Sequence, residues 1–310
     1  MKAVLINHQA VGQLEIGDVD VPDQQPGETL VAVKAFSLNR GDLKRTEVGQ
    51  GGDQAGWDFS GIVESAAPDG SGPASGARVV GMSRRREGFA ELVSVPTLDV
   101  AAIPDGVSFT DAAALPVAGL TALYSLERCE RLLGSNVLIT GASGGVGVLA
   151  CQLAVHMGAH VYGQIRNVEH ESLIASTGAT PVLTADGSAV SECGPFRSII
   201  DGVGGSLLAK VLPSLSEDGR AVLYGFTESR TAEFGIADLI FTGAGRIEGF
   251  YLFRETEFES CAKGLARLSQ LVDAELLNCH VNVIEDWAKV GTVAADLSQR
   301  RFAGKATLTI

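Results

Sequence analysis

The stretch NVLITGASGGVGVLACQLAV, residues 136–155, decides the fold prediction because it joins three kinds of sequence in a fixed order. An apolar run rich in β-forming residues comes first, a glycine cluster follows, and a helix-like run closes the stretch. A strand that passes through glycines into a helix brings several backbone N–H groups to the helix N-terminus, where the helix dipole also favours an anion. We therefore predict a phosphate-binding loop made of Gly141, Ala142, Ser143, Gly144, Gly145, Val146 and Gly147.

The spacing of the glycines indicates which phosphate compound the loop binds. Gly141, Gly144 and Gly147 lie three residues apart, which suits a tight turn, close approach of a pyrophosphate, and packing of the helix on the strand. The spacing differs from the usual G-x-G-x-x-G, and a simple helix-capping turn is the alternative. A P-loop is excluded because no Lys-Ser or Lys-Thr pair follows the glycines. The further strand and helix units downstream favour a dinucleotide.

Those downstream units alternate regularly. The strand-like runs HVYGQI, RSIID and AVLYG are separated by helix-like runs at residues 169–177 and 207–215, and RIEGFYL reads as a last strand. Alternation of this kind gives right-handed crossovers and a doubly wound parallel sheet. We predict a Rossmann domain over residues 114–249.

The first 110 residues follow a different pattern. Short β-branched runs such as KAVLI, TLVAVKAF and RVVGM are separated by Pro, Gly and Asp, which is typical of a barrel-like antiparallel sheet. Near the C-terminus, residues 255–277 have apolar positions at helical spacing beginning with Phe258, and HVNVIE and GKATLTI read as strands. We predict an α/β protein whose second domain, an antiparallel β-barrel, combines residues 1–113 with 250–310.

Charge and composition narrow the possible partners. The 310 residues carry 24 basic and 37 acidic side chains, a formal net charge of -13, which repels nucleic-acid backbones and anionic bilayers alike. The most apolar window, residues 112–126, is shorter than the roughly 18 residues of a membrane helix, and the N-terminal apolar run is too short for a signal-peptide core. Five widely spaced cysteines read as reduced thiols. We expect a cytoplasmic protein with neither a nucleic-acid nor a membrane partner.

The choice between the two dinucleotides is made at the end of the next strand. A carboxylate at that point binds the ribose 2′-OH of NADH, whereas a cation binds the 2′-phosphate of NADPH. In HVYGQIRNVEH no acid occurs before Glu169, and Arg166 and Asn167 stand at the discriminating position. NADPH is therefore the predicted cofactor, with a solvated loop arginine as the alternative for Arg166.

The segment TGASGGVG also matches the T-G-x-x-x-G-x-G loop of short-chain dehydrogenases, which pair this loop with a Tyr-x-x-x-Lys motif. No lysine follows any tyrosine by four residues here: the residues at those positions are Arg128, Arg166, Glu228 and Glu255. The loop also lies after about 140 residues of other sequence rather than at the N-terminus. We therefore reject this family.

A β-rich first part followed by the glycine loop resembles the medium-chain dehydrogenase/reductase superfamily, and within it the quinone oxidoreductase group. The similar pieces occur in order: PGETLVAVKAFSLNRGD, GWDFSGIVES, GFAELVSVP, LPVAGLTALYSL, NVLITGASGGVG, IIDGVGG and RFAGKATLTI. The resemblance covers nearly the whole chain. It implies a GroES-like β-barrel beside the Rossmann domain and a homodimer formed through the edge strand RIEGFYLF.

The zinc ligands of the related alcohol dehydrogenases are missing. Their first-block Cys and second-block Gly-His-Glu are replaced here by SLNRGD and GWDFSG, and the four-cysteine lobe is also missing. Zinc needs three or four converging N, S or O ligands, so we expect a protein without a metal. His156 and His160 are not expected to form a metal pair because Gly158 lies between them and His160 starts a strand.

The resemblance also implies site residues. Asn39, Asp42 and Thr121 are expected near the nicotinamide as catalytic residues. Further cofactor contacts are expected from Asp201, Gly202, Val203, Gly225, Phe226, Phe250, Tyr251, Leu252 and Lys305.

Structural roles are the alternatives for several of these residues. Asn39 could be a turn residue and Asp42 a helix N-cap or structural carboxylate. Thr121 could bond to its own helix, and Lys305 could be a surface lysine on a strand. The run Arg84–Arg86 is expected to be a solvated loop.

The implied chemistry is hydride transfer to a quinone or enone, because a conjugated acceptor spreads the arriving negative charge without a Lewis acid. Several relatives have a tyrosine shortly after the Asn-x-x-Asp block, but LKRTEVGQGG offers no phenol. A 2-alkenal or enoyl thioester reductase remains the enzymatic alternative. The second alternative is a cofactor-binding protein with little turnover.

Overall fold

The computed structural model describes residues 1–241, 243 and 245–310, and these form two compact units. Unit 1 combines residues 1–120 with 256–310, and unit 2 comprises residues 121–255. The sequence-based boundaries were placed at 113/114 and 249/250. In the structure, both boundaries between the units lie a few residues later, at Leu120/Thr121 and at Glu255/Thr256.

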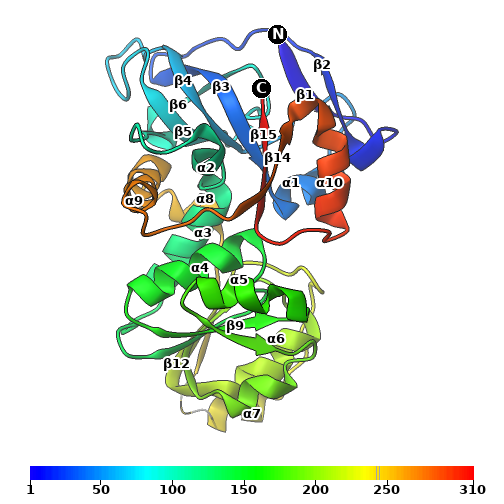
Figure 1. Ribbon diagram of the computed structural model, residues 1–310, viewed down its shortest axis with the longest axis vertical. Helices are drawn as coiled ribbons and strands as arrows, with labels where there is room; N and C mark the ends of the chain where they lie inside the picture. The colour runs from blue at the N-terminus through cyan, green and yellow to red at the C-terminus, as the bar shows by residue number, and fades with distance from the viewer. Residues whose placement is uncertain (242, 244) are drawn as a thin grey trace. The chain divides into compact units, whose positions relative to one another are not determined.

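Unit 1 contains a seven-stranded, mainly antiparallel sheet in the order β14-β15-β3-β4-β5-β7, with β6 also paired to β3 (Figure 1). Only β14 and β15 run parallel to each other. A hairpin of β1 and β2 forms a separate small sheet. The strands are β1 (Lys2–Ile6), β2 (Leu14–Asp18), β3 (Glu28–Leu38), β4 (Asp58–Ser65), β5 (Arg78–Met82), β6 (Leu92–Pro96), β7 (Val100–Ala102), β14 (Val281–Asp286) and β15 (Lys305–Thr309).

The last strand explains why the C-terminal tail belongs to unit 1. Strand β15 lies between β14 and β3, and Leu308 faces the register position of Phe36. Phe36, Phe89 and Leu308 are fully buried in one core cluster, with the rings of Phe36 and Phe89 stacked at 4.3 Å between centroids. The helices of this unit are α1 (Arg40–Thr46), α2 (Phe109–Ala113), α9 (Cys261–Asp273) and α10 (Val290–Ser298), and α3 (Pro116–Glu127) continues from unit 1 into unit 2.

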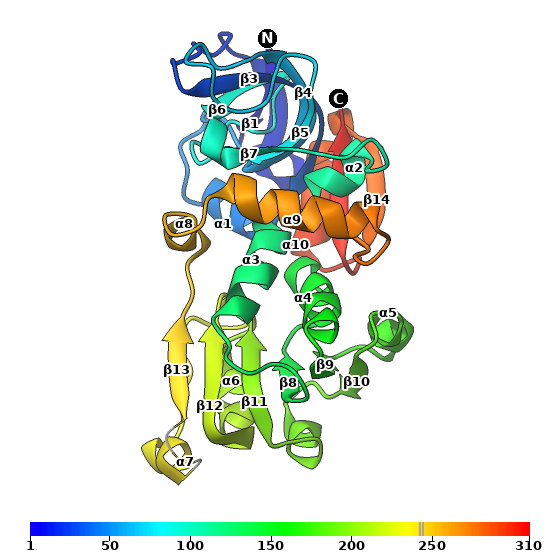
Figure 2. The ribbon, with the colours of Figure 1, turned by 90° about the vertical axis from the view of Figure 1, so that its left-hand side faces the viewer.

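Unit 2 is built on a six-stranded sheet in the order β10-β9-β8-β11-β12-β13, in which every neighbouring pair is parallel (Figure 2). The strands are β8 (Asn136–Ile139), β9 (His160–Ile165), β10 (Thr180–Leu183), β11 (Phe196–Asp201), β12 (Leu215–Leu223) and β13 (Arg246–Gly249). The helices are α4 (Gly145–His156), α5 (Glu171–Ser176), α6 (Gly205–Val211), α7 (Ile236–Phe241) and α8 (Leu252–Glu255). The predicted α/β class, with a doubly wound parallel sheet and an antiparallel β domain, is confirmed.

Two sequence-based element predictions are wrong. The strand predicted over RIEGFYLF ends at Gly249, and Leu252–Glu255 form the short helix α8 instead. The helix predicted from Glu255 begins only at Cys261, because the Ser260 side chain accepts the Lys263 N–H and caps it there. Phe258 consequently lies outside the helix and is 71% exposed.

Strand β10 was missing from the prediction, and its sequence, TPVL, contains Pro181. Proline has no N–H for a sheet ladder and is tolerated mainly in edge strands. Strand β10 is such a strand, since it pairs only with β9 at one end of the sheet.

No helix in the described ranges is long and apolar enough to cross a bilayer.

Candidate functional site: a glycine loop and a buried polar network

The glycine loop between β8 and α4 has the geometry that its sequence predicts. Gly141 adopts φ +60°, a left-handed conformation that favours glycine. A Cβ on Gly147 would meet the Gly141 carbonyl oxygen at 2.5 Å and the Ala142 Cα at 2.7 Å. The loop and the first turn of α4 therefore need glycine at both positions.

The start of α4 presents unbonded donors. Gly144 is the N-cap, and the first intrahelical bond runs from the Val148 N–H to the Gly144 carbonyl. Within the part of the chain that the structure describes, the N–H groups of Gly145, Val146 and Gly147 have no hydrogen-bond acceptor. Three free donors at a helix N-terminus fit a phosphate group.

Gln164 holds the loop in place, and the sequence reasoning missed it. Its buried side chain accepts the Gly141 N–H at 2.9 Å and donates to the Thr184 carbonyl. The Ala142 N–H donates to the Gln164 carbonyl at 3.0 Å. A glutamine in the apolar strand β9, two residues before Arg166, was the available signal.

Asp201, at the end of β11, is engaged within the protein. It is fully buried, accepts the Thr140 hydroxyl and accepts the Gly204 N–H at 2.8 Å. Burial raises the pKa of this carboxyl, against the lowering effect of the Thr140 hydrogen bond. These contacts tie the turn after β11, which includes Gly202 and Val203, to the end of β8.

The turn after β12 lies against the same region. A Cβ on Gly225 would meet the Gly202 carbonyl oxygen at 2.8 Å, so the two turns can approach only without a side chain there. Phe226 follows, 44% exposed, with the Arg230 guanidinium 5.5 Å from its ring centroid. In the segment after β13, Phe250 is half-buried, Tyr251 is exposed and Leu252 is buried.

Arg166 and Asn167 follow β9 immediately and are both exposed. Hydrogen bonds from Ser206 lower the pKa of Glu228, and the positive charge of Arg166 contributes a smaller lowering. The Arg166 side chain is thus accessible at the carboxyl edge of the sheet.

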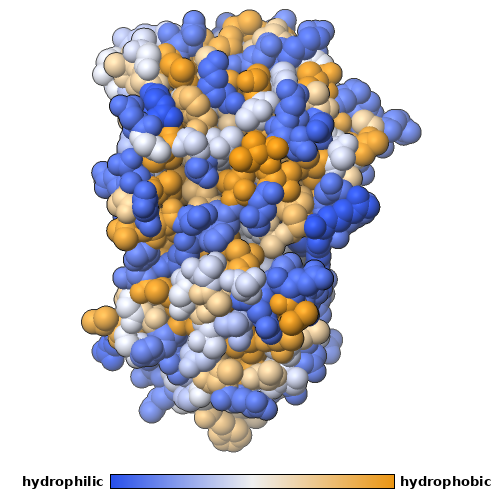
Figure 3. Space-filling view, in the orientation of Figure 1, coloured by the Kyte–Doolittle hydropathy of each residue, from blue (hydrophilic) through white to orange (hydrophobic). Residues whose placement is uncertain are grey.

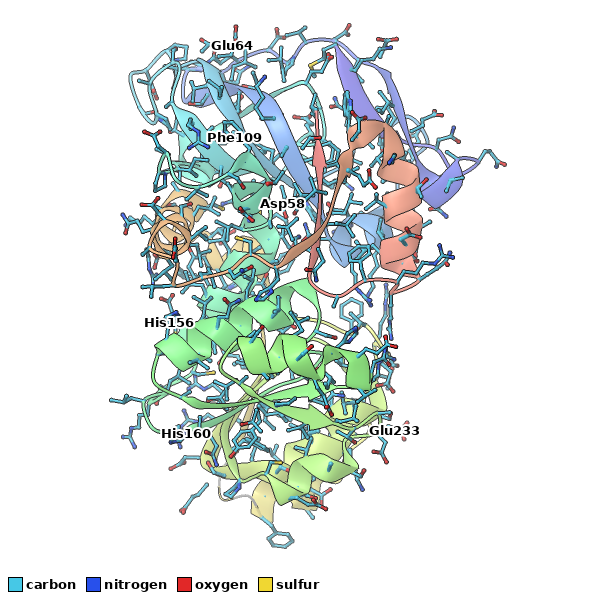
Figure 4. The ribbon with its side chains drawn as sticks, in the orientation of Figure 1. Asp58, Glu64, Phe109, His156, His160 and Glu233 are labelled. Atoms are coloured by element: carbon cyan, nitrogen blue, oxygen red, sulfur yellow. The ribbon has the colours of Figure 1, made fainter. Side chains whose placement is uncertain are left out.

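In unit 1 the predicted residues Asn39 and Lys305 meet around Asp58, which Figure 4 labels on β4. The Asn39 side chain donates to Asp58 Oδ2 at 2.7 Å and accepts from the Lys305 ammonium at 2.6 Å. Lys305 also donates to the Leu38 carbonyl and lies 3.6 Å from Asp58 Oδ2. Asp58 further accepts bonds from Ser37 and from the Val117 N–H.

This network decides between the alternatives for its members. Lys305 is 3% exposed, so the alternative of a surface lysine is wrong. Asn39 is the N-cap of α1, and Asp42 is the third residue of that helix, whose Oδ2 accepts the Asn39 N–H at 2.8 Å. Asp58 was missed, although an aspartate at the start of a buried strand was visible in GWDFSG.

Burial dominates the titration of the network. It raises the pKa of the Asp42 carboxyl to about 7, and the charge of Asp58 adds to the rise. Burial raises the pKa of Asp58 and lowers that of Lys305, although their mutual attraction opposes both shifts. Two carboxylates face one ammonium, so a proton on Asp42 brings the cluster to neutrality.

Thr121 lies in α3 as the first residue of unit 2 and is 6% exposed.

The arginine run lies in the turn after β5, where Arg84 and Arg85 are exposed as expected for a solvated loop, but both side chains are also paired with acids. Arg84 makes two hydrogen bonds from its Nε and one from Nη2 to the Asp99 carboxylate, at 2.8–3.0 Å. Arg85 donates to Glu28 at 2.7 Å. Both acids are buried, which explains why the arginines are held against unit 1.

Across the residues described, no group of three His, Cys, Asp or Glu side chains could hold a metal ion. His156 ends α4 and His160 starts β9, and Figure 4 labels them on these separate elements. Burial raises the pKa of the Cys129 thiol to about 11 and that of Cys151 to about 12, which keeps both protonated and poor metal ligands at neutral pH.

Two family models match the chain. One, described as "Alcohol dehydrogenase GroES-like domain", matches residues 25–106, and one described as "Zinc-binding dehydrogenase" matches residues 145–268. The "Quinone oxidoreductase-like protein 2" of Bos taurus is 27% identical over 96% of this chain and 89% of its own length.

Two further relatives extend the comparison. "Spectinabilin polyketide synthase system protein NorB" of Streptomyces orinoci is 32% identical over 72% of this chain, which spans only 11% of that longer protein. The crystal structure of Escherichia coli quinone oxidoreductase complexed with NADPH is 20% identical and has a TM-score of 0.88, with 100% of both chains covered. That structural similarity shows a shared fold.

The two matched domains and the fold place the chain in a class: it belongs to the medium-chain dehydrogenase/reductase superfamily. Within that superfamily, the chain is similar to the quinone oxidoreductases compared above.

Proposed function

We propose that the protein is a zinc-independent, NADPH-dependent reductase that transfers hydride to a quinone or another conjugated carbonyl compound. The observation that carries this proposal is the glycine loop, with three unbonded N–H groups at the start of α4 and the exposed Arg166 after the neighbouring strand. In this proposal the loop binds the pyrophosphate and Arg166 binds the 2′-phosphate.

The residues of the loop fit such a cofactor on structural grounds. Side chains at Gly141, Gly147 or Gly225 would be strained or would collide with backbone, so the chain keeps this edge of the sheet open. When bound, NADPH supplies the hydride. Gln164 and Asp201 act as positioning residues that hold the two turns in the conformation the cofactor requires.

The arrangement of the polar groups in unit 1 supports the choice of a conjugated acceptor. Asn39, Asp58 and Lys305 use their polar atoms on one another, and no described cluster of side chains suits a Lewis-acidic metal. An acceptor that spreads the arriving charge over its own π system needs less help from the protein than a simple ketone does. Asn39, Asp42 and Thr121 remain the proposed catalytic residues, as the family resemblance implies.

The test is an NADPH oxidation assay with purified protein and three acceptors: 9,10-phenanthrenequinone, a 2-alkenal and a 2-enoyl thioester. We expect the quinone to be reduced fastest, with solvent protonating the product. Faster turnover of the alkenal or the thioester would favour the alternative reductases. Tight NADPH binding with no turnover of any acceptor would favour a non-enzymatic cofactor-binding protein.

We also propose that the protein forms a homodimer through the edge of the parallel sheet. Strand β13 pairs only with β12, so one side of its backbone has no partner strand in the described chain. In α7 nearby, Ile236, Ile240 and Phe241 are 74%, 63% and 87% exposed. Figure 3 shows orange to tan residues at the end of unit 2 where Figure 1 labels α7, a surface suited to burial against a second copy.

A further inference from the structure

A second polar pocket, of about 200 Å³, lies in unit 2 away from the glycine loop. Among the residues that the structure describes, those lining it are all polar or charged and include Arg131, Arg197, Arg220 and Arg246. Arg246 is the first residue of β13 and Arg197 the second of β11. The pocket therefore lies toward the amino ends of the strands, whereas the glycine loop follows the carboxyl end of β8.

The sheet register places two of these arginines side by side. Arg220 of β12 pairs with Arg246 of β13 in the parallel ladder, and neighbouring strands are about 4.8 Å apart. Like charges at such positions are destabilising unless an anion offsets them. Arg220 has its own partners, Glu130 Oε1 at 3.1 Å and Glu248 Oε2 at 3.4 Å.

The other three guanidinium groups lack such partners. In residues 1–241, 243 and 245–310, no carboxylate oxygen lies within ion-pair distance of Arg131, Arg197 or Arg246. Arg197 makes one hydrogen bond, to the Glu217 carbonyl at 3.2 Å.

The charge of the lining is also unlike that of the chain. Among the described lining residues, four arginines face two acids, Glu130 and Asp218, in a protein whose formal net charge is -13. An excess of positive charge in a small concave site focuses the local field and attracts anions.

We propose that this pocket binds a small phosphate-bearing anion. A guanidinium group can donate paired hydrogen bonds that match the oxygen geometry of phosphate. Three guanidinium groups without a carboxylate partner around one pocket suit a multiply charged anion. The lining residues that the structure describes are all polar, so they offer no surface for a large apolar body. The ligand class is therefore inorganic phosphate, pyrophosphate or a small phosphate monoester. This site is separate from the glycine loop and does not depend on the proposed reductase activity.

The test is calorimetric titration of the full chain with pyrophosphate at constant ionic strength. The pocket variants Arg197→Gln and Arg246→Gln each remove one uncompensated cation. We expect each to weaken the pyrophosphate Kd about tenfold or more, since hydrogen bonds between charged groups contribute enough for that factor. The exposed Lys210→Gln, with the same loss of charge elsewhere in unit 2, should change Kd by less than about twofold.

A second variant separates this pocket from the glycine loop. Gly147→Ala, which disturbs the loop that the proposed function assigns to the pyrophosphate, should leave pyrophosphate binding at the pocket intact, and the pocket substitutions should weaken that binding by the same factor in this background. Binding lost in Gly147→Ala but kept in Arg197→Gln and Arg246→Gln would overturn the proposal, as would the absence of saturable binding to the unsubstituted protein.

Two further ligands define the chemistry. If glycerol phosphate binds as tightly as pyrophosphate, the pocket accepts phosphate monoesters. If glycerol phosphate binds more weakly than pyrophosphate, the pocket is assigned to inorganic anions. Citrate binding as tightly as every phosphate compound would contradict phosphate selectivity. Thermal unfolding without ligand verifies that the variants remain folded.

Discussion

Asp42, Asp58 and Lys305 form a buried cluster with one more acid than base, and Asn39 connects them. Each polar end of the Asn39 amide has a partner inside the protein, so this residue links β3, β4 and β15 through its side chain. The catalytic residue that the resemblance implies is therefore also a structural one. Its amide orientation is set by Lys305 on one side and Asp58 on the other.

The first prediction concerns the pH dependence of stability. Because burial raises the pKa of Asp42 from 3.8 to about 7, its contribution to stability is full below about pH 4 and is lost as pH rises toward 7. Asp42→Asn cannot ionise and can still accept the Asn39 N–H. Relative to the unsubstituted protein it should gain unfolding free energy between pH 4 and 7, by at most about 1.4 kcal/mol per pH unit.

Urea unfolding at several pH values measures this difference. The matched control is Asp105→Asn, because the Asp105 side chain is fully exposed, and its profile should run parallel to that of the unsubstituted protein. Parallel profiles for Asp42→Asn as well would contradict the assignment of a raised Asp42 pKa.

The second prediction concerns Arg166. If its guanidinium binds the 2′-phosphate, Arg166→Ala should weaken NADPH binding about 10- to 100-fold, as expected for a hydrogen bond between charged groups. NADH binding should change by about twofold or less, because NADH lacks that phosphate. Fluorescence titration of both cofactors measures the two ratios, with Lys210→Ala as the control. Equal losses for NADPH and NADH would count against the choice of cofactor.

At the scale of elements, the glycine loop depends on how closely α4 approaches the end of β8. Gly147 is buried, and its missing side chain lets the helix lie against the Gly141 carbonyl and the Ala142 backbone. The same close approach leaves the first N–H groups of α4 facing outward. Packing and phosphate binding therefore depend on the same absent Cβ.

The third prediction follows from that packing. Gly147→Ala places a Cβ 2.5 Å from a carbonyl oxygen, so the helix must shift, with a loss of about 1–3 kcal/mol in unfolding free energy. NADPH binding should weaken at the same time. The control is Gly51→Ala in unit 1, where the nearest atom to the added Cβ is the Ile6 carbonyl oxygen at 3.9 Å, an ordinary contact. Urea unfolding measures the unfolding free energy, and cofactor titration measures the affinity for NADPH. A Gly147→Ala variant with unchanged stability and unchanged NADPH affinity would contradict the role assigned to Gly147.

At the scale of the whole molecule, the proposed dimer accounts for an edge strand and a helix that are otherwise left exposed. Strand β13 is short, Arg246–Gly249, and has a single neighbour in its sheet. Short edge strands limit unwanted pairing, and the exposed apolar residues of α7 add apolar surface that a second copy could bury.

The fourth prediction tests this interface. The protein should sediment as a dimer, and the double substitution Ile240→Glu/Phe241→Glu should shift it to a monomer, because it places two like charges in the interface. Leu98→Glu, at an exposed apolar position of unit 1, is the control and should leave the dimer intact. Sedimentation velocity distinguishes the species. An unsubstituted protein that sediments as a monomer would refute the dimer.

Much of the fold could be predicted from the sequence because its main signals are local. The strand, glycine and helix order at residues 136–155 requires only neighbouring residues, and the alternation after it determines a parallel sheet by the rule of right-handed crossovers. Where a local signal was weak, the prediction failed. The predicted start of the helix at Glu255 was wrong because the capping residue is Ser260. The apolar residues FYLF were predicted to continue a strand, although Leu252 and Phe253 begin the short helix α8.

The same distinction between local sequence signals and long-range contacts applies to the candidate site. By itself, the sequence determined the fold class, the glycine loop and the position of Arg166, because each depends on residues close together in the chain. Only the tertiary structure decided that Lys305 is buried against Asn39 and Asp58, that Gln164 holds the loop, and that four arginines line one pocket. Those contacts join residues from separate strands and loops, and burial and charge pairing are set by the packing of the whole sheet rather than by any local pattern.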